Sequence, residues 1–251
     1  MKFLLAFMLS LPVFAQDVCT NFGPQTPRDI SSSYGLNNVL FSPAPSAEKM
    51  NLCNIHFHKN AEHKGPEFSV YAGPGDNGGY KCDITPTLSD YELRPVQKNI
   101  CTNVKPGDTI ELHWVHTSCP VAPGPGLGSC LSDTCPNPQL RVETQVFVLV
   151  NDETAANMQD FDALEERVDG YFQARELPLS IETATFLGST TGPSYTQSKC
   201  SPLHVTWNVS KTCQKMDINS LHQWCANNKF NEDHGHGVRQ LVTDPRLLNN
   251  F

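Results

Sequence analysis

The chain has 251 residues, of which 39% are hydrophobic, and its formal net charge at pH 7 is −8. This acidic balance repels phosphate, so it argues against a nucleic-acid-binding protein. The length suffices for one large domain, and we find no linker that would divide it.

The first residues are typical of a secretory signal peptide. Lys2 precedes an apolar run over residues 3–14, and Val13 and Ala15 place compact side chains at the −3 and −1 positions of a cleavage site. The run is too short to anchor the chain in a bilayer. We therefore predict a signal peptide over residues 1–15, cleaved after Ala15, and a secreted or periplasmic domain over residues 16–251.

Ten cysteines agree with export, because an even number in an exported chain predicts disulfides. None lies in a Cys-x-x-Cys pair, which argues against a zinc ribbon. No stretch after residue 15 approaches the ~20 apolar residues of a membrane span, so we expect none.

In chain order, the pattern predicts a mostly β (α+β) domain. Some segments alternate like strands or are rich in β-branched residues, and two others carry apolar residues at helical spacing. The predicted strands are 54–58, 109–116, 141–150 and 205–209. The predicted helices are 158–172, from Met158, Phe161, Leu164, Val168 and Phe172, and a shorter one over 218–225. Long Pro- and Gly-rich loops, notably 73–79 and 120–138, connect these elements, and such loops often carry functional sites.

Two histidines that lie two residues apart indicate a metal site. His56 and His58 face the same side of the first predicted strand, because side chains alternate across a strand. His113, on the next predicted strand, can supply a third imidazole if the two strands are neighbours. Three protein ligands and one water form the open arrangement of catalytic zinc.

Two polar residues can support these ligands. Glu111 and Asn54 each lie two residues before a ligand, where they can accept the second N–H of the imidazole. We interpret His63 and His116 as structural or surface histidines. His116 has the opposite strand parity to the ligand on its strand, and His63 lies in a predicted loop.

These residues and several further motifs resemble those of the alpha-class carbonic anhydrases, and more closely the related delta class. The similar motifs are, in chain order, Gln25-Thr26-Pro27-Arg28-Asp29-Ile30, His56-Phe57-His58, Glu62-His63, Glu111-Leu112-His113-Trp114-Val115-His116, Gly188-Ser189-Thr190-Thr191-Gly192-Pro193, Cys200, Val205-Thr206-Trp207 and Leu241-Val242-Thr243-Asp244-Pro245-Arg246. They cover most of the mature chain, and several matches in one order are more specific than any single motif.

The resemblance implies a single domain with a large central, twisted, mainly antiparallel sheet, peripheral helices and long loops. It implies a carbonic anhydrase, a lyase (carbonate dehydratase) that hydrates carbon dioxide reversibly to bicarbonate and a proton by attack of zinc-bound hydroxide. Zn²⁺ would be the cofactor, and carbon dioxide and bicarbonate the partners. Neither nucleic acid nor a membrane span is expected, and a homodimer stays open.

By the same resemblance, the metal ligands are His56, His58 and His113. The catalytic residues are Thr190, which accepts the hydrogen bond of the hydroxide, and Glu62, which orients that threonine. The carbon dioxide pocket would be lined by Val115, Val205, Trp207 and Thr191.

Departures from the family pattern leave two alternatives open. The glycine–threonine motif is one residue shorter here, so either Thr190 or Thr191 can be the partner of the hydroxide. Polar residues fall where the family keeps small or apolar pocket residues, so either the strand register differs by one or the pocket is more polar; they are Arg141, Glu143 and Gln145. No histidine precedes His56, so the proton-shuttling histidine of the family's early strand is missing. Nothing in the sequence places another at the pocket mouth among His204, His222, His234 and His236.

The resemblance also implies a disulfide between Cys19 and Cys200. Nearness in the chain favours Cys130–Cys135 and Cys213–Cys225. The other four cysteines allow three connectivities. Of these we favour Cys53–Cys119, which flank the two ligand strands, with Cys82–Cys101 as the remaining pair.

Two other functions fit parts of the pattern. His56-x-His58-x3-Glu62 with His113 also matches the first half of the cupin metal motif, which would bind iron or manganese in a jelly roll. The glycines around a cupin motif fit poorly, however. A non-catalytic zinc-binding protein on the same fold would keep the histidines. Metal content together with a hydration assay distinguishes the three.

Overall fold

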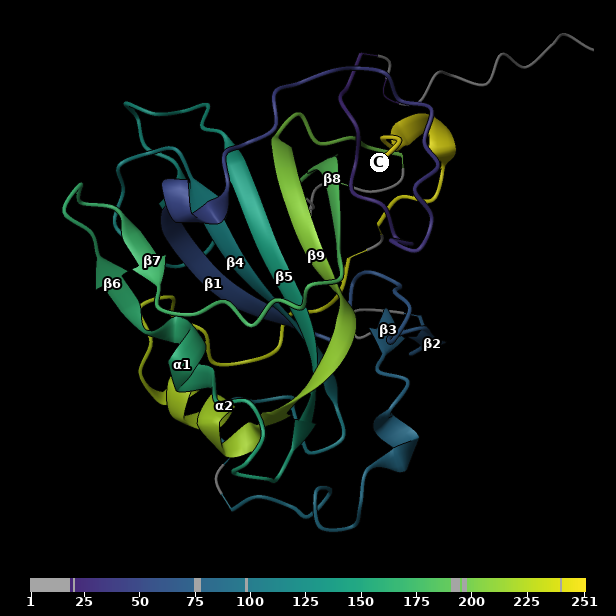
Figure 1. Ribbon diagram of the computed structural model, residues 1–251, viewed down its shortest axis with the longest axis vertical. Coiled ribbons are helices and arrows are strands. Elements are labelled where there is room, and N and C mark those ends of the chain that lie inside the picture. Colours follow the sequence, from purple (N-terminus) through teal and green to yellow (C-terminus); the bar gives the residue numbers. More distant parts are fainter. Residues whose placement is uncertain are drawn as a thin grey trace, which may run out of the picture.

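A five-stranded twisted sheet forms the centre of the protein (Figure 1). In sheet order its strands are β1 (Asn51–Lys59), β4 (Thr109–Thr117), β5 (Leu140–Val150), β9 (His204–Asp217) and β8 (Thr183–Ser189). Neighbouring strands pair antiparallel except β5 and β9, which run parallel. The prediction of a mostly β fold around a mainly antiparallel sheet is therefore confirmed.

The computed structural model describes residues 19, 21–74, 78–97, 99–190, 195, 198–239 and 241–251. The predicted signal peptide and Thr191 lie outside these residues. All four predicted strands are present and each is longer than predicted, most of all β9, which continues through the predicted 205–209 to Asp217.

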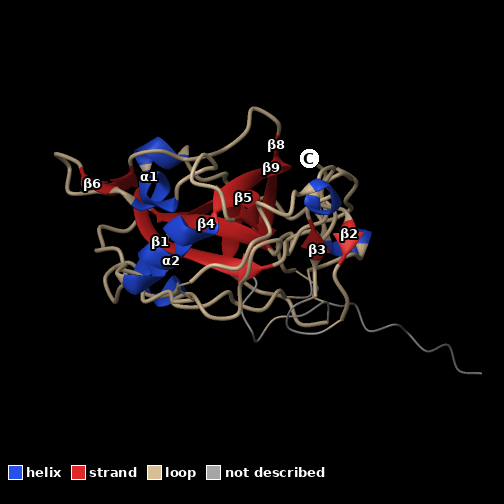
Figure 2. Ribbon diagram, turned by 90° about the horizontal axis from the view of Figure 1, so that it is seen from below, coloured by secondary structure: helices blue, strands red, loops and turns tan. Residues whose placement is uncertain are grey.

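Smaller elements surround the sheet. Two short hairpins pair β2 (Val70–Tyr71) with β3 (Tyr80–Lys81), and β6 (Leu164–Glu166) with β7 (Phe172–Ala174). The α-helices are α1 (Met158–Asp162) and α2 (Ile218–Ala226), and short 3₁₀ turns span Ala47–Lys49, Thr85–Thr87, Leu127–Cys130 and Pro245–Leu247. Figure 2 shows both α-helices beside β1 and β4, away from β2 and β3. Within the described residues, no helix has the length and apolar character needed to cross a membrane.

The predicted helix over 158–172 is wrong beyond its first turn. The chain leaves α1 after Asp162 and forms the β6–β7 hairpin instead. Its turn contains Asp169-Gly170, with Gly170 at φ +79°, and Asp-Gly is a strong hairpin signal that the apolar periodicity concealed. Val168, counted as part of the apolar stripe, is fully exposed near this turn. The second predicted helix is confirmed as α2, which Asp217 caps by accepting hydrogen bonds from the N–H groups of Asn219 and Ser220.

The alternation of side chains gives the sheet two different buried faces. One face carries Val115, Val142 and Trp207 together with the predicted ligands. The other packs Trp114 and Phe147 against the helices, and the indole N–H of Trp114 donates to the Phe161 carbonyl at 3.0 Å. Each face thus has its own core, with the helices covering the one opposite the ligands.

The register of β5 settles the open question about its polar residues. Val142 pairs with Val115 and Thr144 with His113, so these side chains share the ligand face. Arg141 and Glu143 therefore point to the other face, where they form an ion pair. Gln145 follows the same parity and donates to the carbonyl of Thr212. The strand register therefore differs by one residue from the family pattern, which was the first of the two sequence alternatives. Val142, and not these polar residues, faces the site from β5.

Five disulfides join all ten cysteines, each of which lies within the described residues. Cys19 pairs with Cys200, as the resemblance implies. A framework of this density is typical of an oxidising, extracellular environment.

The other four predicted pairings are wrong. Two of them would have had to join cysteines on opposite faces of the sheet. Cys213 lies in the core of the ligand face and Cys225 in the core beneath the helices, so the sheet separates them. Cys82 and Cys101 are separated in the same way. The bonds found are Cys82–Cys213, Cys101–Cys225, Cys53–Cys130 and Cys119–Cys135, which replace the expected Cys53–Cys119, Cys82–Cys101, Cys130–Cys135 and Cys213–Cys225.

His116 should make the fold sensitive to acid. It is fully buried in β4, with Nδ1 3.2 Å from the Trp114 carbonyl oxygen, and burial lowers its pKa to about 4. Between about pH 6.5 and pH 4 the unfolded chain binds a proton that the folded chain excludes, so stability falls as the pH falls. We expect this histidine to contribute a loss on the order of 3 kcal/mol across that window.

Urea unfolding at several pH values from 7.5 to 4.5 measures this loss. His116→Gln should flatten the decline in the free energy of unfolding, whereas His234→Gln, at an exposed site, should leave it unchanged. Parallel curves for wild type and His116→Gln would contradict the assignment.

Candidate metal centre

Three imidazoles converge where β1 and β4 pair. His56 lies directly opposite His113 in the antiparallel register, and His58 follows on the same face of β1. One ring nitrogen from each histidine lies within 4.8 Å of the other two. The neighbouring strands and the shared face that the sequence predicts are both present.

The second ring nitrogen of each histidine is already engaged. Nδ1 of His56 lies 2.7 Å from Oδ1 of Asn54, and Nε2 of His113 lies 2.8 Å from Oε1 of Glu111. Nδ1 of His58 lies 3.0 Å from the carbonyl oxygen of Gly237. These acceptors leave Nε2 of His56, Nε2 of His58 and Nδ1 of His113 as the three nitrogens that can hold a metal.

The free nitrogens fit a tetrahedral ion. Nε2 of His56 and Nδ1 of His113 lie 3.2 Å apart. Zinc bound to nitrogens at about 2.0–2.1 Å requires a separation of roughly 3.3–3.4 Å at tetrahedral angles. Nε2 of His58 is buried and has no hydrogen-bond partner among the described residues, as expected of an atom reserved for a metal. Burial also lowers the pKa of His56 and that of His58, the latter to about 4, so both rings are neutral as ligation requires.

Glu111 is the buried anchor of this arrangement. Its Oε1 accepts from Nε2 of His113 and from Nδ1 of His63 at 2.7 Å. Its Oε2 accepts from the backbone N–H groups of Glu62, at 2.6 Å, and His63, at 3.2 Å. Burial alone would raise the pKa of this carboxyl, but the adjacent His63 and His113 outweigh it and hold the pKa well below its usual range. His63 is therefore a fully buried residue that positions Glu111, and His116 lies on the opposite face.

The link expected between Thr190 and Glu62 is not formed. The hydroxyl of Thr190 lies 3.1 Å from that of Ser201, although Thr190 does line the cavity over the histidines. Oε1 of Glu62 accepts from the N–H of Arg239 at 3.0 Å. Oε2 of Glu62 is buried without a partner among the described residues. This carboxylate therefore has one acceptor atom to offer a further donor.

A cavity of about 680 Å³ opens above His56 and His113. One side is apolar, and it includes the predicted pocket residues Val115, Val205 and Trp207. The Trp207 ring lies 5.4 Å from that of His113, centroid to centroid. Val142, Leu127 and Leu140 complete this side.

The other side of the cavity is polar and was missed by sequence reasoning. It is formed by residues 230–239, including Glu232, Asp233, His234, His236 and Arg239. His236 pairs with Glu232 at 2.8 Å, and His234 with Asp233 at 2.6 Å. The run Glu-Asp-His-Gly-His could have pointed to this side of the cavity, since its two histidines are spaced like the histidine pair of β1.

This segment reaches the site by pairing with β1. Lys59 N–H donates to the carbonyl of His236 at 2.8 Å, and His236 N–H donates to that of Phe57 at 3.0 Å. A Cβ at Gly235 would meet Lys59 and Phe57 at 3.1–3.2 Å, so glycine allows this close approach. The later motif over 241–246 instead lies beside the N-terminal segment, where Arg28 N–H donates to the Val242 carbonyl.

Comparison with known proteins assigns the family. The model of the delta carbonic anhydrase family matches residues 47–220, which include all three histidines. No curated protein matches the chain. A solved structure of the alpha-carbonic anhydrase from Thermovibrio ammonificans, in complex with the inhibitor sulfanilamide, is 16% identical. That alignment covers 88% of this chain and 87% of the other, with a TM-score of 0.33, too low to add to the fold described above. On the strength of the family match, the chain belongs to the delta carbonic anhydrases, a family of enzymes.

Proposed function

We propose that this protein is a secreted zinc enzyme that hydrates carbon dioxide reversibly to bicarbonate and a proton. The observation that carries the proposal is the set of three converging imidazole nitrogens of His56, His58 and His113, beside a cavity that His56 and His113 line and that has an apolar wall. Family membership supports the same activity. The N-terminal sequence and the disulfides support secretion, with cleavage after Ala15.

Zinc held by three neutral imidazoles would keep one open position and lower the pKa of a water there to about 7. The chain's own residues supply orientation. Asn54, Glu111 and the Gly237 carbonyl each hold the far nitrogen of one ring, so the rings are fixed before a metal binds. Such supporting groups set both the tautomer and the direction of the ligand.

The two sides of the cavity suit the substrate and the products. Carbon dioxide carries no charge and no hydrogen-bond donor, so it fits beside Val115, Val142 and Trp207. The proton released at each turnover must reach solvent, and the polar side offers acceptors for it. His234, about half exposed and paired with Asp233, stands at that side.

The cupin alternative has less support. In it Glu62 would be a fourth ligand beside the histidines. Here Oε1 of Glu62 lies 3.5 Å from Nδ1 of His58, on the ring edge opposite the free Nε2, and it accepts from Arg239. A central open sheet of five strands with two small hairpins also differs from a jelly roll.

We expect one zinc per chain, and removal of His113 to abolish it. His113→Ala takes away one of three ligands, whereas Glu111→Gln keeps all three but disturbs the groups that Glu111 holds, His113 among them, and should weaken zinc binding roughly 10–100-fold. His63→Ala and His116→Ala should keep stoichiometric zinc. Elemental analysis and chelator competition measure both quantities, and a His113→Ala protein that retains one zinc per chain would show that the ligand set is wrong.

Zinc-loaded protein should accelerate carbon dioxide hydration in a stopped-flow assay, and anions and aromatic sulfonamides that take the open position should inhibit it. Protein with one zinc per chain and no rate above buffer at micromolar concentration would identify a non-catalytic zinc protein. Iron or manganese in the purified protein would favour the cupin function instead.

The hydroxyl of Thr190 pairs with that of Ser201 and not with Glu62, so we choose the sequence alternative, Thr191, as the partner of the hydroxide. Thr191→Ala should lower turnover on the order of 10²-fold without loss of zinc, and Thr190→Ala much less. Glu62→Gln should lower turnover by a similar factor to Thr191→Ala. The double variant should be no slower than either single variant, because Glu62 and Thr191 act as one unit. A larger loss in Thr190→Ala than in Thr191→Ala would return the role to Thr190.

A further inference from the structure

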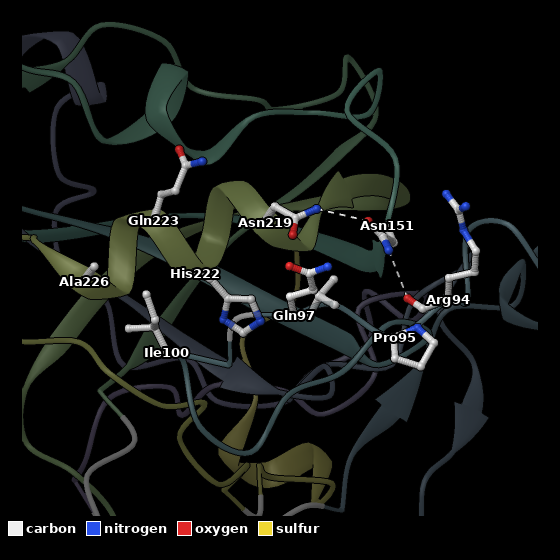
Figure 3. A pocket seen from close by; sticks show the side chains of 10 residues that line it. Arg94, Pro95, Gln97, Ile100, Asn151, Asn219, His222, Gln223 and Ala226 are labelled. Carbon is white, nitrogen blue, oxygen red and sulfur yellow. Dashed lines mark hydrogen bonds between the residues drawn. The ribbon is translucent and has the colours of Figure 1, made fainter.

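Two loops are each held by an asparagine carboxamide, but only one of the two lines the metal cavity. The loop that contains Arg94 lies beside α2, next to a pocket of about 630 Å³, and Asn151 donates to the Arg94 carbonyl there at 3.1 Å (Figure 3). This pocket shares no lining residue with the metal cavity. The loop over residues 119–135, in contrast, carries Leu127, which lines the metal cavity and packs against the core of the ligand face.

A β-bulge where this second loop meets β1 aims two consecutive side chains at the ligand face. The pairing of β1 with β4 shifts between Leu52 and Asn54, so Cys53 is the extra residue. Leu52 lies in the core beneath the helices, whereas Cys53 lies in the core of the ligand face and Asn54 lines the metal cavity. Bulges re-aim side chains beside functional sites. This one places a disulfide next to the residue that holds His56.

Covalent and hydrogen bonds fix the loop to this bulge. The Cys53–Cys130 disulfide ties the bulge to the last residue of the 3₁₀ turn that Leu127 begins. The Gly124 N–H donates to the Cys53 carbonyl at 3.0 Å, and the Gly124 carbonyl accepts from Nδ2 of Asn54 at 2.9 Å. The two cysteines and Asn54 are at most 1% exposed, so these bonds form out of reach of solvent.

The Gly124 carbonyl decides which end of the Asn54 carboxamide faces His56. A carbonyl oxygen can only accept, so Nδ2 of Asn54 must face Gly124 and Oδ1 must face the imidazole. Oδ1 also can only accept, and it lies 2.7 Å from Nδ1 of His56, so Nδ1 carries the proton and Nε2 is bare. With the carboxamide turned round, its NH₂ group would face Nδ1, and the neutral ring would carry its proton on Nε2, the atom that a metal needs.

We propose that the loop over residues 119–135 positions the metal ligand His56, because its Gly124 carbonyl holds Asn54 in the orientation that keeps Nε2 of His56 bare. Asn54 is the positioning residue, and the disulfide of the loop to the bulge holds the Gly124 carbonyl in place. The inference rests on the proposed zinc centre. It gives the loop a role in metal affinity in addition to its place in the cavity wall.

Zinc affinity in a double-mutant cycle tests this coupling by chelator competition. Asn54→Ala should weaken zinc binding roughly 10–100-fold. Cys53→Ala/Cys130→Ala, which removes the loop disulfide, should weaken it about fivefold or more in the wild-type background and by less than about twofold in the Asn54→Ala background, because the loop acts through Asn54. An equal loss in both backgrounds, or none in either, would overturn the proposal.

Two controls separate this role from a general loosening of the fold. Asn51→Ala frees the same loop at its start, where Asn51 donates to the carbonyls of Cys119 and Val121 at 2.9 and 2.7 Å. Cys19→Ala/Cys200→Ala removes a disulfide in a different apolar cluster. Both should lower the melting temperature and leave zinc affinity unchanged. A loss of affinity in either control that equals that of the loop-disulfide variant would contradict the proposed route.

The tautomer of His56 in metal-free protein gives a readout with every disulfide intact. Long-range ¹H–¹⁵N correlation of ¹⁵N-histidine-labelled protein identifies the protonated ring nitrogen. Wild type and Asn51→Ala should carry the proton on Nδ1, and Asn54→Ala should populate the form with the proton on Nε2. Asn54→Asp should keep the wild-type tautomer, because both carboxylate oxygens accept and its orientation no longer matters. An Nε2-protonated His56 in wild type, or no change in Asn54→Ala, would overturn the proposal.

Hydrogen exchange of the Gly124 amide reads the coupling from the side of the loop, again without removing a disulfide. Exchange should be faster in Asn54→Ala than in wild type, since the coupling is reciprocal, and equal rates would contradict it. Wild-type protein that binds no zinc but shows the expected tautomers would count against the proposed function and not against the positioning of His56.

Discussion

The antiparallel register between β1 and β4 is the constraint on which the rest of the site depends. It sets His56 directly opposite His113, and side-chain alternation then brings His58 to the same face. A shift of one residue would turn His113 away from the cavity and place a large apolar side chain there instead. The opposite face resists such a shift, because Phe57 and Trp114 are fully buried beneath the helices. The apolar core thus fixes the positions of the polar groups.

A second layer of polar groups fixes the orientation of the three histidines of the proposed ligand set. Glu111 joins β4 to the turn after β1, and the Gly237 carbonyl joins His58 to a segment almost 180 residues later in the chain. Both carboxylate oxygens of Glu111 and the Gly237 carbonyl accept hydrogen bonds, whereas Oε2 of Glu62 and Nε2 of His63 are buried without a partner among the described residues. Buried polar networks that are satisfied in this way are rigid, and a rigid site binds metal without first having to order its ligands. The same segment that supplies the Gly237 carbonyl also forms the polar side of the cavity, so ligand support and cavity shape are linked.

Features that follow from local periodicity could be predicted from the sequence, and features set by distant packing could not. The alternation of His56, His58 and His113 predicted the ligand set, and Asn54 and Glu111 followed from the same period of two. Four of the five disulfides were mispredicted; Cys213 and Cys225, for example, are near in the chain but lie on opposite faces of the sheet. The helix over 158–172 failed because an Asp-Gly turn outweighs apolar spacing. The spacing of His234 and His236 marks their segment as a candidate, but its place beside the site depends on the pairing of His236 with β1, which the spacing does not predict.

X-ray absorption at the zinc K-edge tests the central claim most directly, because it reads the atoms bound to the metal without reference to activity. We expect three imidazole nitrogens at about 2.0–2.1 Å and one further light atom, with no sulfur. In His113→Ala, the imidazole scattering from any zinc that can be loaded should drop by about one third, from three rings to two. A sulfur neighbour at about 2.3 Å, or only two imidazoles in the wild-type protein, would contradict the three-histidine centre.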